Sequence, residues 1–412
     1  MESSTIRKAA WRILPFVMLL YVVSFLDRVN IGFAALTMNA DLGLSAAAFG
    51  LGAGIFFVGY VLFEVPSNLI LYRVGARLWI ARVMVSWGIV SGLTAFIHGA
   101  GGFYVLRLLL GVAEAGFFPG IILYLSQWFP ARHRAAMVAL FMAAAPLSTV
   151  VGSPLSAALL GLHGLGLKGW QWLFLAEALP AVLLGLMVPF VLTDRPEQAR
   201  WLDAQERAWL AQRLADEERG SRRGLWHGVS DARVLALSLV YFGTAAGLYA
   251  AGIWSPLIIR QYGLTTLQVG FVNAGPSLVA VAAMLWWSAR SDRLGERRWH
   301  VAIACLVAAA GFVWAGLAGG LLPALAALTL VNVGVSASKP PLWAMPGQFL
   351  AGPAAAAGIA VINALGNLGG LAGPAVIGWL RGVTGSFAGG LYFVAALLVL
   401  SAGLTLALSR RP

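Results

Sequence analysis

Long apolar stretches follow one another along almost the whole chain, separated by short polar segments. They cover residues 13–36, 49–71, 78–97, 102–124, 136–160, 170–192, 234–258, 267–289, 299–319, 321–347, 356–380 and 387–409. About 20 apolar residues in a helix cross the hydrocarbon layer of a membrane, and most of these stretches reach that length. A membrane barrel would instead show segments of about ten residues with alternating polarity. The pattern therefore predicts an all-α membrane protein with twelve transmembrane helices.

The composition narrows the class of protein further. Of the 412 residues, 60% are hydrophobic, whereas soluble domains are about 45–50% apolar. This difference excludes a soluble enzyme, and it also argues against a nucleic-acid binder despite the net charge of +12. The five histidines show no metal-ligand spacing, and the single cysteine, Cys305, lies in an apolar stretch. We therefore expect neither a metal site nor a cofactor.

The basic residues are distributed unevenly between the two sides of the predicted helix bundle. Most of the 28 Lys and Arg lie in segments that share a side with the N-terminus, and Lys168, Arg260 and Arg381 fall on the other side. Because loops rich in Lys and Arg stay in the cytoplasm, both termini are predicted to be cytoplasmic. The positive net charge is therefore a signal of topology rather than of a binding surface.

An internal repeat divides the chain into two parts. A shift of 220 residues aligns Tyr21 with Tyr241, Pro154 with Pro374, and Arg73-x-Gly75-x-Arg77 with Arg293-x-Gly295-x-Arg297. Matches of this kind in one register indicate a repeated unit. We predict a six-helix unit over residues 1–192, a charged cytoplasmic linker over 193–233 with a surface helix within 197–219, and a second six-helix unit over 234–412. Two parallel repeats of this kind are one known plan of secondary transporters.

Ionisable side chains inside the predicted spans are the strongest functional signal, because charges in a membrane are costly and mark transport pathways by default. They are Asp27, Arg28, Glu64, Arg107, Glu114, Glu177 and Lys339. In the repeat register, the charges of spans 1 and 4 (Asp27, Arg28, Arg107 and Glu114) correspond to Gly247, Leu248, Ala327 and Gly334. The second unit folds without these charges, so they indicate function in the first unit.

Spans 1 and 4 are predicted to line a central cavity. Arg107 and Glu114 are two helical turns apart and share a helix face, whereas Asp27 and Arg28 diverge by about 100°. An arginine can bind both oxygens of a substrate carboxylate. A carboxylate held away from water can load and release protons near neutral pH, and Glu114, near the middle of its span, is the first candidate, with Asp27 second. The alternative is a purely structural pair of salt bridges, Asp27 with Arg107 and Arg28 with Glu114.

The remaining three ionisable residues receive other interpretations. Glu64, near the end of span 2, is expected to act in gating or packing rather than in substrate contact. Glu177 is expected to be structural. Lys339 either extends to the surface or supplies a second cation for a dianionic substrate, and we favour the surface position.

Several segments resemble the major facilitator superfamily and, within it, the anion:cation symporter family. The stretch Asp292–Arg298 resembles the loop signature of the superfamily, whereas its first copy, residues 72–77, lacks the aspartate. The segments SFLDRVNIGFA, RLLLGVAEAGFFPGIILYLSQWFP, RSDRLGERRWH and GIAVINALGNLGGLAGPAVIGWL resemble the symporter family. Residues 241–300 are most similar to its bacterial permeases for tartrate, phthalate and 4-hydroxyphenylacetate.

The resemblance implies the major facilitator fold and proton-driven import of a small organic anion by alternating access. The expected setting is the lipid bilayer of a bacterial inner membrane, and we expect a monomer that uses the proton gradient as its energy source. By resemblance, Arg28 binds the substrate carboxylate, Asp27 and Glu114 couple protons, and Arg107 pairs with these carboxylates.

The resemblance also assigns further residues. Tyr60, Trp343 and Asn363 match cavity-lining positions, and the loop copies supply gating or structural residues, namely Arg73, Gly75, Arg77, Asp292, Arg293, Gly295 and Arg297. Some relatives have a tyrosine where this chain has Phe25, and the second unit offers few polar groups. Both features favour a small or partly aromatic carboxylate over a polyhydroxylated sugar acid. Two alternatives remain open, a proton-coupled exporter of acids or drugs and a sensor that binds an organic acid without transporting it.

Overall fold

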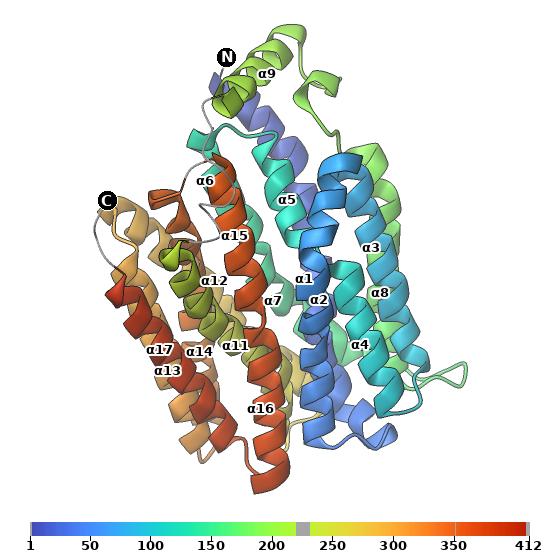
Figure 1. Ribbon diagram of the computed structural model, residues 1–412. Coiled ribbons are helices and arrows are strands. Elements are labelled where there is room, and N and C mark those ends of the chain that lie inside the picture. Colours follow the sequence, from blue (N-terminus) through green and yellow to red (C-terminus); the bar gives the residue numbers. More distant parts are fainter. Residues whose placement is uncertain (1, 220–230, 351, 409–412) are drawn as a thin grey trace.

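The protein is almost entirely α-helical in a computed structural model that describes residues 2–219, 231–350 and 352–408 (Figure 1). Twelve segments among these residues are long and apolar enough to cross a membrane, which confirms the predicted number of spans. The middle of the predicted linker, residues 220–230, lies outside the described residues.

The helices follow the predicted spans, with three spans divided in two. The first six spans are α1 (Glu2–Asp41), α2 (Ala46–Val74), α3 (Ala76–Leu93), α4 (Ala100–Glu114) with α5 (Phe117–Ser126), α6 (Ala131–Met142) with α7 (Ala144–Leu159), and α8 (Gly169–Val191). The last six are α11 (Ala232–Arg260), α12 (Thr266–Leu294), α13 (Arg298–Leu317), α14 (Leu321–Ala344), α15 (Gly352–Asn367) with α16 (Gly369–Thr384), and α17 (Ala388–Ala407). The surface helix of the linker, α9 (Ala204–Arg219), lies within the range 197–219 given from the sequence, and residues 196–198 form a separate 3₁₀ turn that Pro196 starts.

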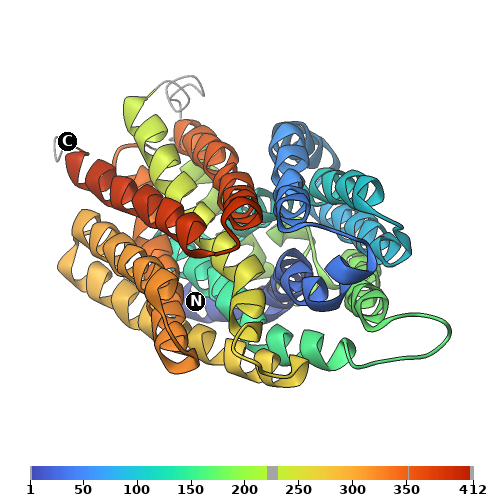
Figure 2. The same cartoon turned by 90° about the horizontal axis from the view of Figure 1, so that it is seen from below.

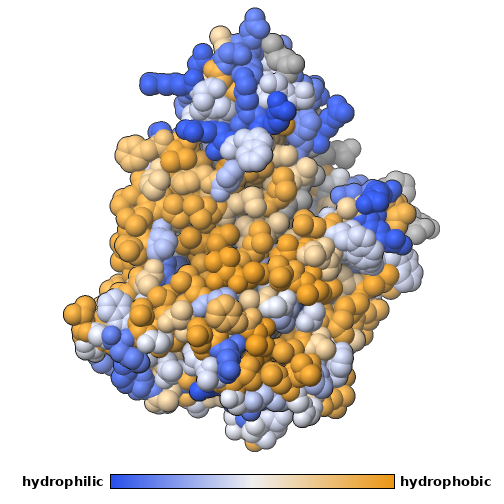
Figure 3. Space-filling view, turned by 180° about the vertical axis from the view of Figure 1, so that it is seen from behind, coloured by the Kyte–Doolittle hydropathy of each residue, from blue (hydrophilic) through white to orange (hydrophobic). Residues whose placement is uncertain are grey.

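The two sets of six spans lie side by side, as the view along the bundle shows (Figure 2). The start of α1 and helix α9 lie at one end of the molecule, which we call the terminal end; Lys8 of α1 binds Glu206 of α9 there, with Nζ 2.7 Å from Oε1. The face seen from behind is broadly hydrophobic along the helices, whereas hydrophilic residues gather at its ends, above all over α9 (Figure 3). This surface is typical of a protein whose sides face lipid.

At the end opposite to the terminal end, glycines bring the first six and the last six spans into backbone contact. A Cβ atom on Gly50 of α2 would lie 2.5 Å from the carbonyl oxygen of Pro374 on α16, and one on Gly378 of α16 would lie 2.4 Å from that of Ala46. Nearby, Asn273 of α12 donates a hydrogen bond of 2.9 Å to the hydroxyl of Ser153 on α7. Small residues permit such close approach between membrane helices. This end of the molecule is therefore closed by tight packing.

Because Gly378 leaves no room for a side chain, Gly378→Ala is expected to loosen this closure. The added Cβ must move about 1 Å to reach ordinary contact with Ala46, and overpacking of this size costs about 1–3 kcal/mol. In a Ser153→Cys background, we expect a membrane-impermeant thiol reagent to label Cys at position 153 about tenfold faster. Gly382→Ala, one turn away and 3.7 Å from the nearest atom, is the control and should leave labelling unchanged. Equal labelling in the two variants would contradict tight packing at Gly378.

Candidate functional site

A buried ion pair joins α1 to α4 in the middle of the molecule. Nε of Arg28 lies 2.6 Å from Oε1 of Glu114, and the two side chains are 6% and 0% exposed. The hydroxyl of Ser24 donates to the same carboxylate oxygen at 2.7 Å. Nη1 of Arg28 donates to the hydroxyl of Tyr249 on α11 at 2.9 Å, so the arginine also connects the first six spans with the last six. Of the two ion pairs considered from the sequence, this one forms.

The position of Glu114 depends on a break in the fourth span. The apolar stretch over 102–124 predicts one continuous helix, but α4 ends at Glu114 because Gly116 adopts a left-handed conformation with φ of 86°. A Cβ there would also lie 2.2 Å from the hydroxyl of Ser67. That hydroxyl donates a 2.6 Å hydrogen bond to the carbonyl of Ala115, which the helix break leaves free. Broken membrane helices are typical of substrate and ion sites in transporters.

Aromatic rings surround the arginine of the pair. The guanidinium of Arg28 lies 5.1 Å from the centroid of the Tyr60 ring and 5.7 Å from that of Phe56. Both rings come from α2, and both are fully buried. Cation–π contacts of this kind hold a guanidinium in place without neutralising its charge.

Arg107 does not form the ion pair that was predicted for it. Its Nη2 donates to the carbonyl oxygen of Ala53 at 3.2 Å, and its guanidinium lies 5.1 Å from the centroid of Phe56. Among the described residues Arg107 has no salt bridge. Glu114 pairs with Arg28 on α1 through Oε1, and Asp27 accepts from neutral donors. The predicted pairing is therefore corrected. Arg107 remains within electrostatic range of both carboxylates, and its role in proton coupling stays a prediction.

Asp27 lies in a second buried cluster that faces away from Arg28. Trp87 and Ser91 of α3 donate to its carboxylate at 2.5 and 3.0 Å. Nδ2 of Asn30 lies 3.4 Å from Oδ1 of Asp27 and 2.8 Å from Oε2 of Glu177 on α8. The structure thus brings together two carboxylates about 150 residues apart in sequence and joins them through one amide. Every hydrogen-bond donor to Asp27 in the described structure is neutral.

The hydrogen bonds of Glu177 predict a difference between two substitutions. Ser156 donates to Oε1 at 2.6 Å and Asn30 to Oε2 at 2.8 Å. Glu177→Leu leaves the buried hydroxyl of Ser156 without its acceptor, and it leaves the amide of Asn30 with only the longer hydrogen bond to Asp27. Because an unpaired buried donor costs about 1–3 kcal/mol, we expect thermal unfolding of the purified protein at a clearly lower temperature. Glu177→Gln keeps a carbonyl acceptor and should unfold close to the wild type. If the two variants unfold at the same temperature, these hydrogen bonds do not stabilise the fold.

A contact between α2 and α15 was missed in the sequence analysis. Nδ2 of Asn363 donates to Oε1 of Glu64, and both side chains are buried. Glu64 was expected to act in gating or packing, yet it lies one turn from Tyr60 on the same face of α2 and within electrostatic range of both Tyr60 and Arg28. The predicted lining residues Tyr60 and Asn363 therefore meet Arg28 and Glu64 in one polar region.

Trp343 and Lys339 of α14 extend this region toward the terminal end. The Trp343 ring lies between Tyr241 of α11 and Phe118 of α5, with ring centroids 5.0 and 6.1 Å away. Nζ of Lys339 lies 5.9 Å from the centroid of Phe25 on α1, and its charge acts on Arg28. The structure thus places this ammonium between the two sets of spans, not at the surface position that the sequence analysis favoured.

Several polar atoms of this region have no hydrogen-bond partner in the described structure, although they are buried. They are Nη2 of Arg28, the hydroxyl of Tyr60, Oε2 of Glu64, Oε2 of Glu114 and Oδ1 of Asn367. Buried polar atoms in proteins are nearly always paired, and each exception requires an explanation. A concentration of unpaired donors and acceptors at the centre of a helix bundle indicates a site for a polar ligand. We call these five residues the central polar site.

In both loop copies the second arginine pairs with an aspartate, although the aspartate comes from a different segment in each. Nη1 of Arg297 lies 2.5 Å from Oδ1 of Asp292, and Gly295 between them is left-handed with φ of 62°. In the first copy, Asp194 after α8 replaces the missing aspartate, with Oδ2 3.6 Å from Nε of Arg77. Its Oδ1 also accepts from the backbone N–H of Arg77 at 2.8 Å.

The first arginine of each copy differs in exposure from the second arginine, which pairs with an aspartate. Arg73 and Arg293 are exposed, and Gly75, with φ of 97°, links α2 to α3. Glu296, which lies between Gly295 and Arg297 in the second copy, accepts from the backbone N–H of Trp299 at 2.9 Å. Burial raises the pKa of Glu296, but this bond and those from His300 outweigh it, so the pKa lies below the usual range for glutamate. The contacts agree with a gating or structural function, which stays a prediction.

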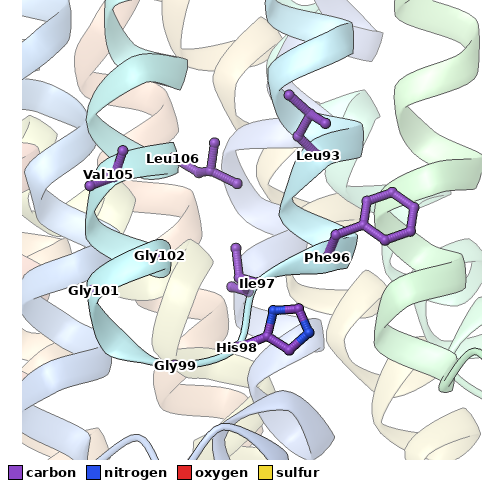
Figure 4. A pocket seen from close by; sticks show the side chains of 9 residues that line it. All are labelled: Leu93, Phe96, Ile97, His98, Gly99, Gly101, Gly102, Val105 and Leu106. Atoms are coloured by element: carbon purple, nitrogen blue, oxygen red, sulfur yellow. The ribbon is translucent and has the colours of Figure 1, made fainter.

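A separate surface hollow of about 570 Å³ lies between the end of α3 and the start of α4 (Figure 4). Its walls are mainly apolar, and Leu93, Phe96 and Val105 expose about half of their side chains to the surroundings. Among the residues that line it, only His98 can ionise. It shares no residue with the central polar site, and its apolar, outward-facing lining is what lipid chains would cover.

No metal site is evident in the part of the chain that the structure describes, where no three His, Cys, Asp or Glu side chains are grouped to hold an ion. Twelve membrane spans around a buried polar site define a multi-pass membrane transporter. Residues 17–374 and 237–412 match the family model of the Major Facilitator Superfamily. The chain belongs to the Major Facilitator Superfamily.

The relatives of the chain are transporters rather than enzymes. Two proteins of Agrobacterium vitis, both named for an inferred transport of tartrate, are 64% and 65% identical to this chain over 414 residues. The matches cover 100% of this chain, 92% of the first protein and 96% of the second. A quinolone resistance transporter of Acinetobacter baumannii is 40% identical over 98% of this chain and 94% of its own. Among solved structures, an inward-facing bacterial homologue of the human lysosomal transporter Spinster superposes with a TM-score of 0.76 at 16% identity, over 97% of this chain and 96% of that one.

Proposed function

We propose that the protein is a proton-coupled symporter that imports a small organic carboxylate, with tartrate as the first candidate, across a bacterial inner membrane. The single observation that carries this proposal is the Arg28–Glu114 pair, in which both partners keep an unpaired polar atom. The tartrate transport named for relatives at 64–65% identity supports the choice of substrate. In this proposal the terminal end faces the cytoplasm, and the protein acts as a monomer.

The ion pair couples anion binding to proton binding. While Glu114 is ionised, it neutralises Arg28 and competes with a substrate carboxylate for the same guanidinium. A proton on Glu114 removes this competition, so Arg28 becomes free to bind both oxygens of the substrate carboxylate. Each ligand therefore raises the affinity for the other, which is the thermodynamic requirement for symport. Asp27, in its own cluster of neutral donors, is the second candidate proton site.

The contacts between the two sets of spans connect this exchange to alternating access. Arg28 of α1 holds Tyr249 of α11 by a hydrogen bond, and Glu64 of α2 holds Asn363 of α15. A substrate that takes over the hydrogen bonds of Arg28 changes the contacts that hold the two sets together. Binding can shift the equilibrium between arrangements only through such differential contacts.

Lys339 extends the proposal to dianions. Its ammonium and the guanidinium of Arg28 are close enough for their charges to interact, and they come from different sets of spans. A dicarboxylate can neutralise both charges at once, whereas a monocarboxylate leaves one without a counter-ion. This arrangement favours a dicarboxylate such as tartrate.

Uptake by reconstituted protein tests the proposal. Proteoliposomes with a more acidic outer solution should accumulate labelled L-tartrate above the outer concentration, and a proton ionophore should abolish the accumulation. Protein-free liposomes provide the background. Uptake that only equilibrates, whatever the pH gradient, would contradict proton coupling; absence of any tartrate uptake would contradict the substrate.

The 40% identity to a quinolone resistance transporter supports a second candidate, a proton-coupled exporter on the same fold. Because quinolones carry a carboxylate, Arg28 suits them as well. Cells that produce the protein should then accumulate less of a quinolone such as norfloxacin than cells that produce the Glu114→Gln variant. Equal accumulation would reject export.

A further inference from the structure

Two polar pairs face each other across the boundary between the two sets of spans. Tyr60 and Glu64 are one turn apart on α2, and Asn363 and Asn367 are one turn apart on α15. The hydrogen bond from Asn363 to Glu64 fixes how the two helices align. Farther from the terminal end, Phe57 of α2 lies against Gly370, where a Cβ would be 2.5 Å from its ring, so the two chains run antiparallel past each other. This alignment places Tyr60 opposite Asn367.

The unpaired atoms of the central polar site are divided between donors and acceptors. Nη2 of Arg28 can only donate, and the hydroxyl of Tyr60 can do so as well. The carbonyl oxygen of Asn367 can only accept, and so can Oε2 of an ionised Glu64. Tyr60 and Glu64 differ by about 6 Å of helix rise, a distance that a short-chain acid can span. The site therefore presents donors to one part of a ligand and acceptors to another part.

The ligand that satisfies both parts is a hydroxylated carboxylate. A carboxylate group can accept hydrogen bonds from Arg28 and Tyr60, but against Glu64 it would meet a like charge. An unsubstituted methylene would leave Glu64 and Asn367 buried without partners, which costs free energy. A hydroxyl group removes both problems, because it donates a hydrogen to an acceptor and carries no charge.

We propose that Glu64, together with Asn367, is a specificity determinant that accepts hydrogen bonds from hydroxyl groups of the substrate. The proposal rests on the proposed function, since Arg28 must hold the carboxylate of the same molecule. The sequence favours a small or partly aromatic carboxylate over a polyhydroxylated sugar acid, because the second unit has few polar groups; recognition of hydroxyl groups by Glu64 changes that expectation. Glu64 belongs to the first unit and reaches this region because α2 packs beside α15 and α16.

Three acids with the same four-carbon skeleton test the proposal, namely L-tartrate with two hydroxyls, L-malate with one and succinate with none. Binding to the detergent-purified protein is measured by isothermal titration calorimetry, which requires neither proton coupling nor a direction of transport. A site built to bind a hydroxyl discriminates strongly against an analogue that lacks it. The wild type should bind the acids in the order tartrate, malate, succinate, with at least about 100-fold between first and last.

The variants separate hydroxyl recognition from charge. Glu64→Leu should weaken tartrate binding about 100-fold and change succinate binding less than about threefold, so that the preference disappears. Glu64→Gln keeps an acceptor oxygen and should retain most of the preference. Glu177→Gln removes a buried carboxylate outside the central polar site and serves as the control, with the wild-type order of affinities.

The outcomes distinguish this inference from the proposed function. Equal weakening of tartrate and succinate in Glu64→Leu would overturn hydroxyl recognition and leave carboxylate transport standing. A wild-type preference for succinate would do the same. If the wild-type protein binds none of the three acids, the proposed substrate is wrong, and the inference is overturned with it.

Discussion

Arg28→Ala is expected to abolish carboxylate uptake. The guanidinium lies at the junction of Glu114, Tyr249 and Tyr60, and its Nη2 is a buried donor without a hydrogen-bond partner in the described structure. Removing one partner of a buried charge pair costs about 2–5 kcal/mol or more, which corresponds to roughly 30-fold to several thousand-fold in affinity. The measurement is the initial rate of labelled tartrate uptake into proteoliposomes with matched protein content.

Two further variants separate substrate binding from folding. Arg28→Lys keeps the charge but loses the planar pair of donors, so we expect an intermediate rate. Arg28→Ala combined with Glu114→Gln removes the uncompensated buried carboxylate and should restore thermal stability without restoring uptake. Wild-type uptake by Arg28→Ala would show that the substrate carboxylate binds elsewhere.

Glu114→Gln is expected to separate exchange from accumulation. The amide cannot load or release a proton, yet its carbonyl still accepts from Ser24, which donates to Glu114 at 2.7 Å in the wild type. Arg28 then stays available to substrate at every pH. Liposomes preloaded with unlabelled tartrate should therefore still take up labelled tartrate by exchange, while accumulation driven by a pH gradient should fall to the level of protein-free liposomes.

The control for this experiment is another buried glutamate. Glu177→Gln also removes a buried negative charge from a span. In the wild type, Ser156 and Asn30 donate hydrogen bonds to this carboxylate. The Glu177→Gln protein should still accumulate tartrate. Gradient-driven accumulation at the wild-type rate in Glu114→Gln would exclude Glu114 as the coupling site. Loss of both exchange and accumulation would assign Glu114 to substrate binding instead.

The spans were predictable from sequence because their cause is local. Each crossing requires a run of apolar residues in one stretch of chain, and this requirement is visible residue by residue. The breaks within spans were not predicted, since the left-handed Gly116 looks like the other glycines of the sequence until its close contact with Ser67 is known. Its consequence, the end of α4 at Glu114, shapes the central polar site.

The members of the site were predicted better than their partners. Membrane charges are rare enough that Arg28 and Glu114 could be selected from sequence alone. The partners depend on how helices rotate against each other, which periodicity does not determine. Arg107 and Asp27 were expected in one network, but Asp27 joins Asn30 and Glu177, and Arg107 binds a backbone carbonyl. The Arg77–Asp194 contact was missed for the same reason, because the aspartate is 117 residues from its partner.

Proton movement driven by the substrate tests the central claim most directly. Proteoliposomes that contain a pH-sensitive dye receive tartrate on the outside, with no imposed pH gradient and with the membrane potential clamped by potassium and valinomycin. Symport through the Arg28–Glu114 pair predicts that the lumen becomes acidic as labelled tartrate enters, and that Glu114→Gln abolishes the pH change. Entry of labelled tartrate without any luminal pH change in the wild type would contradict proton-coupled symport.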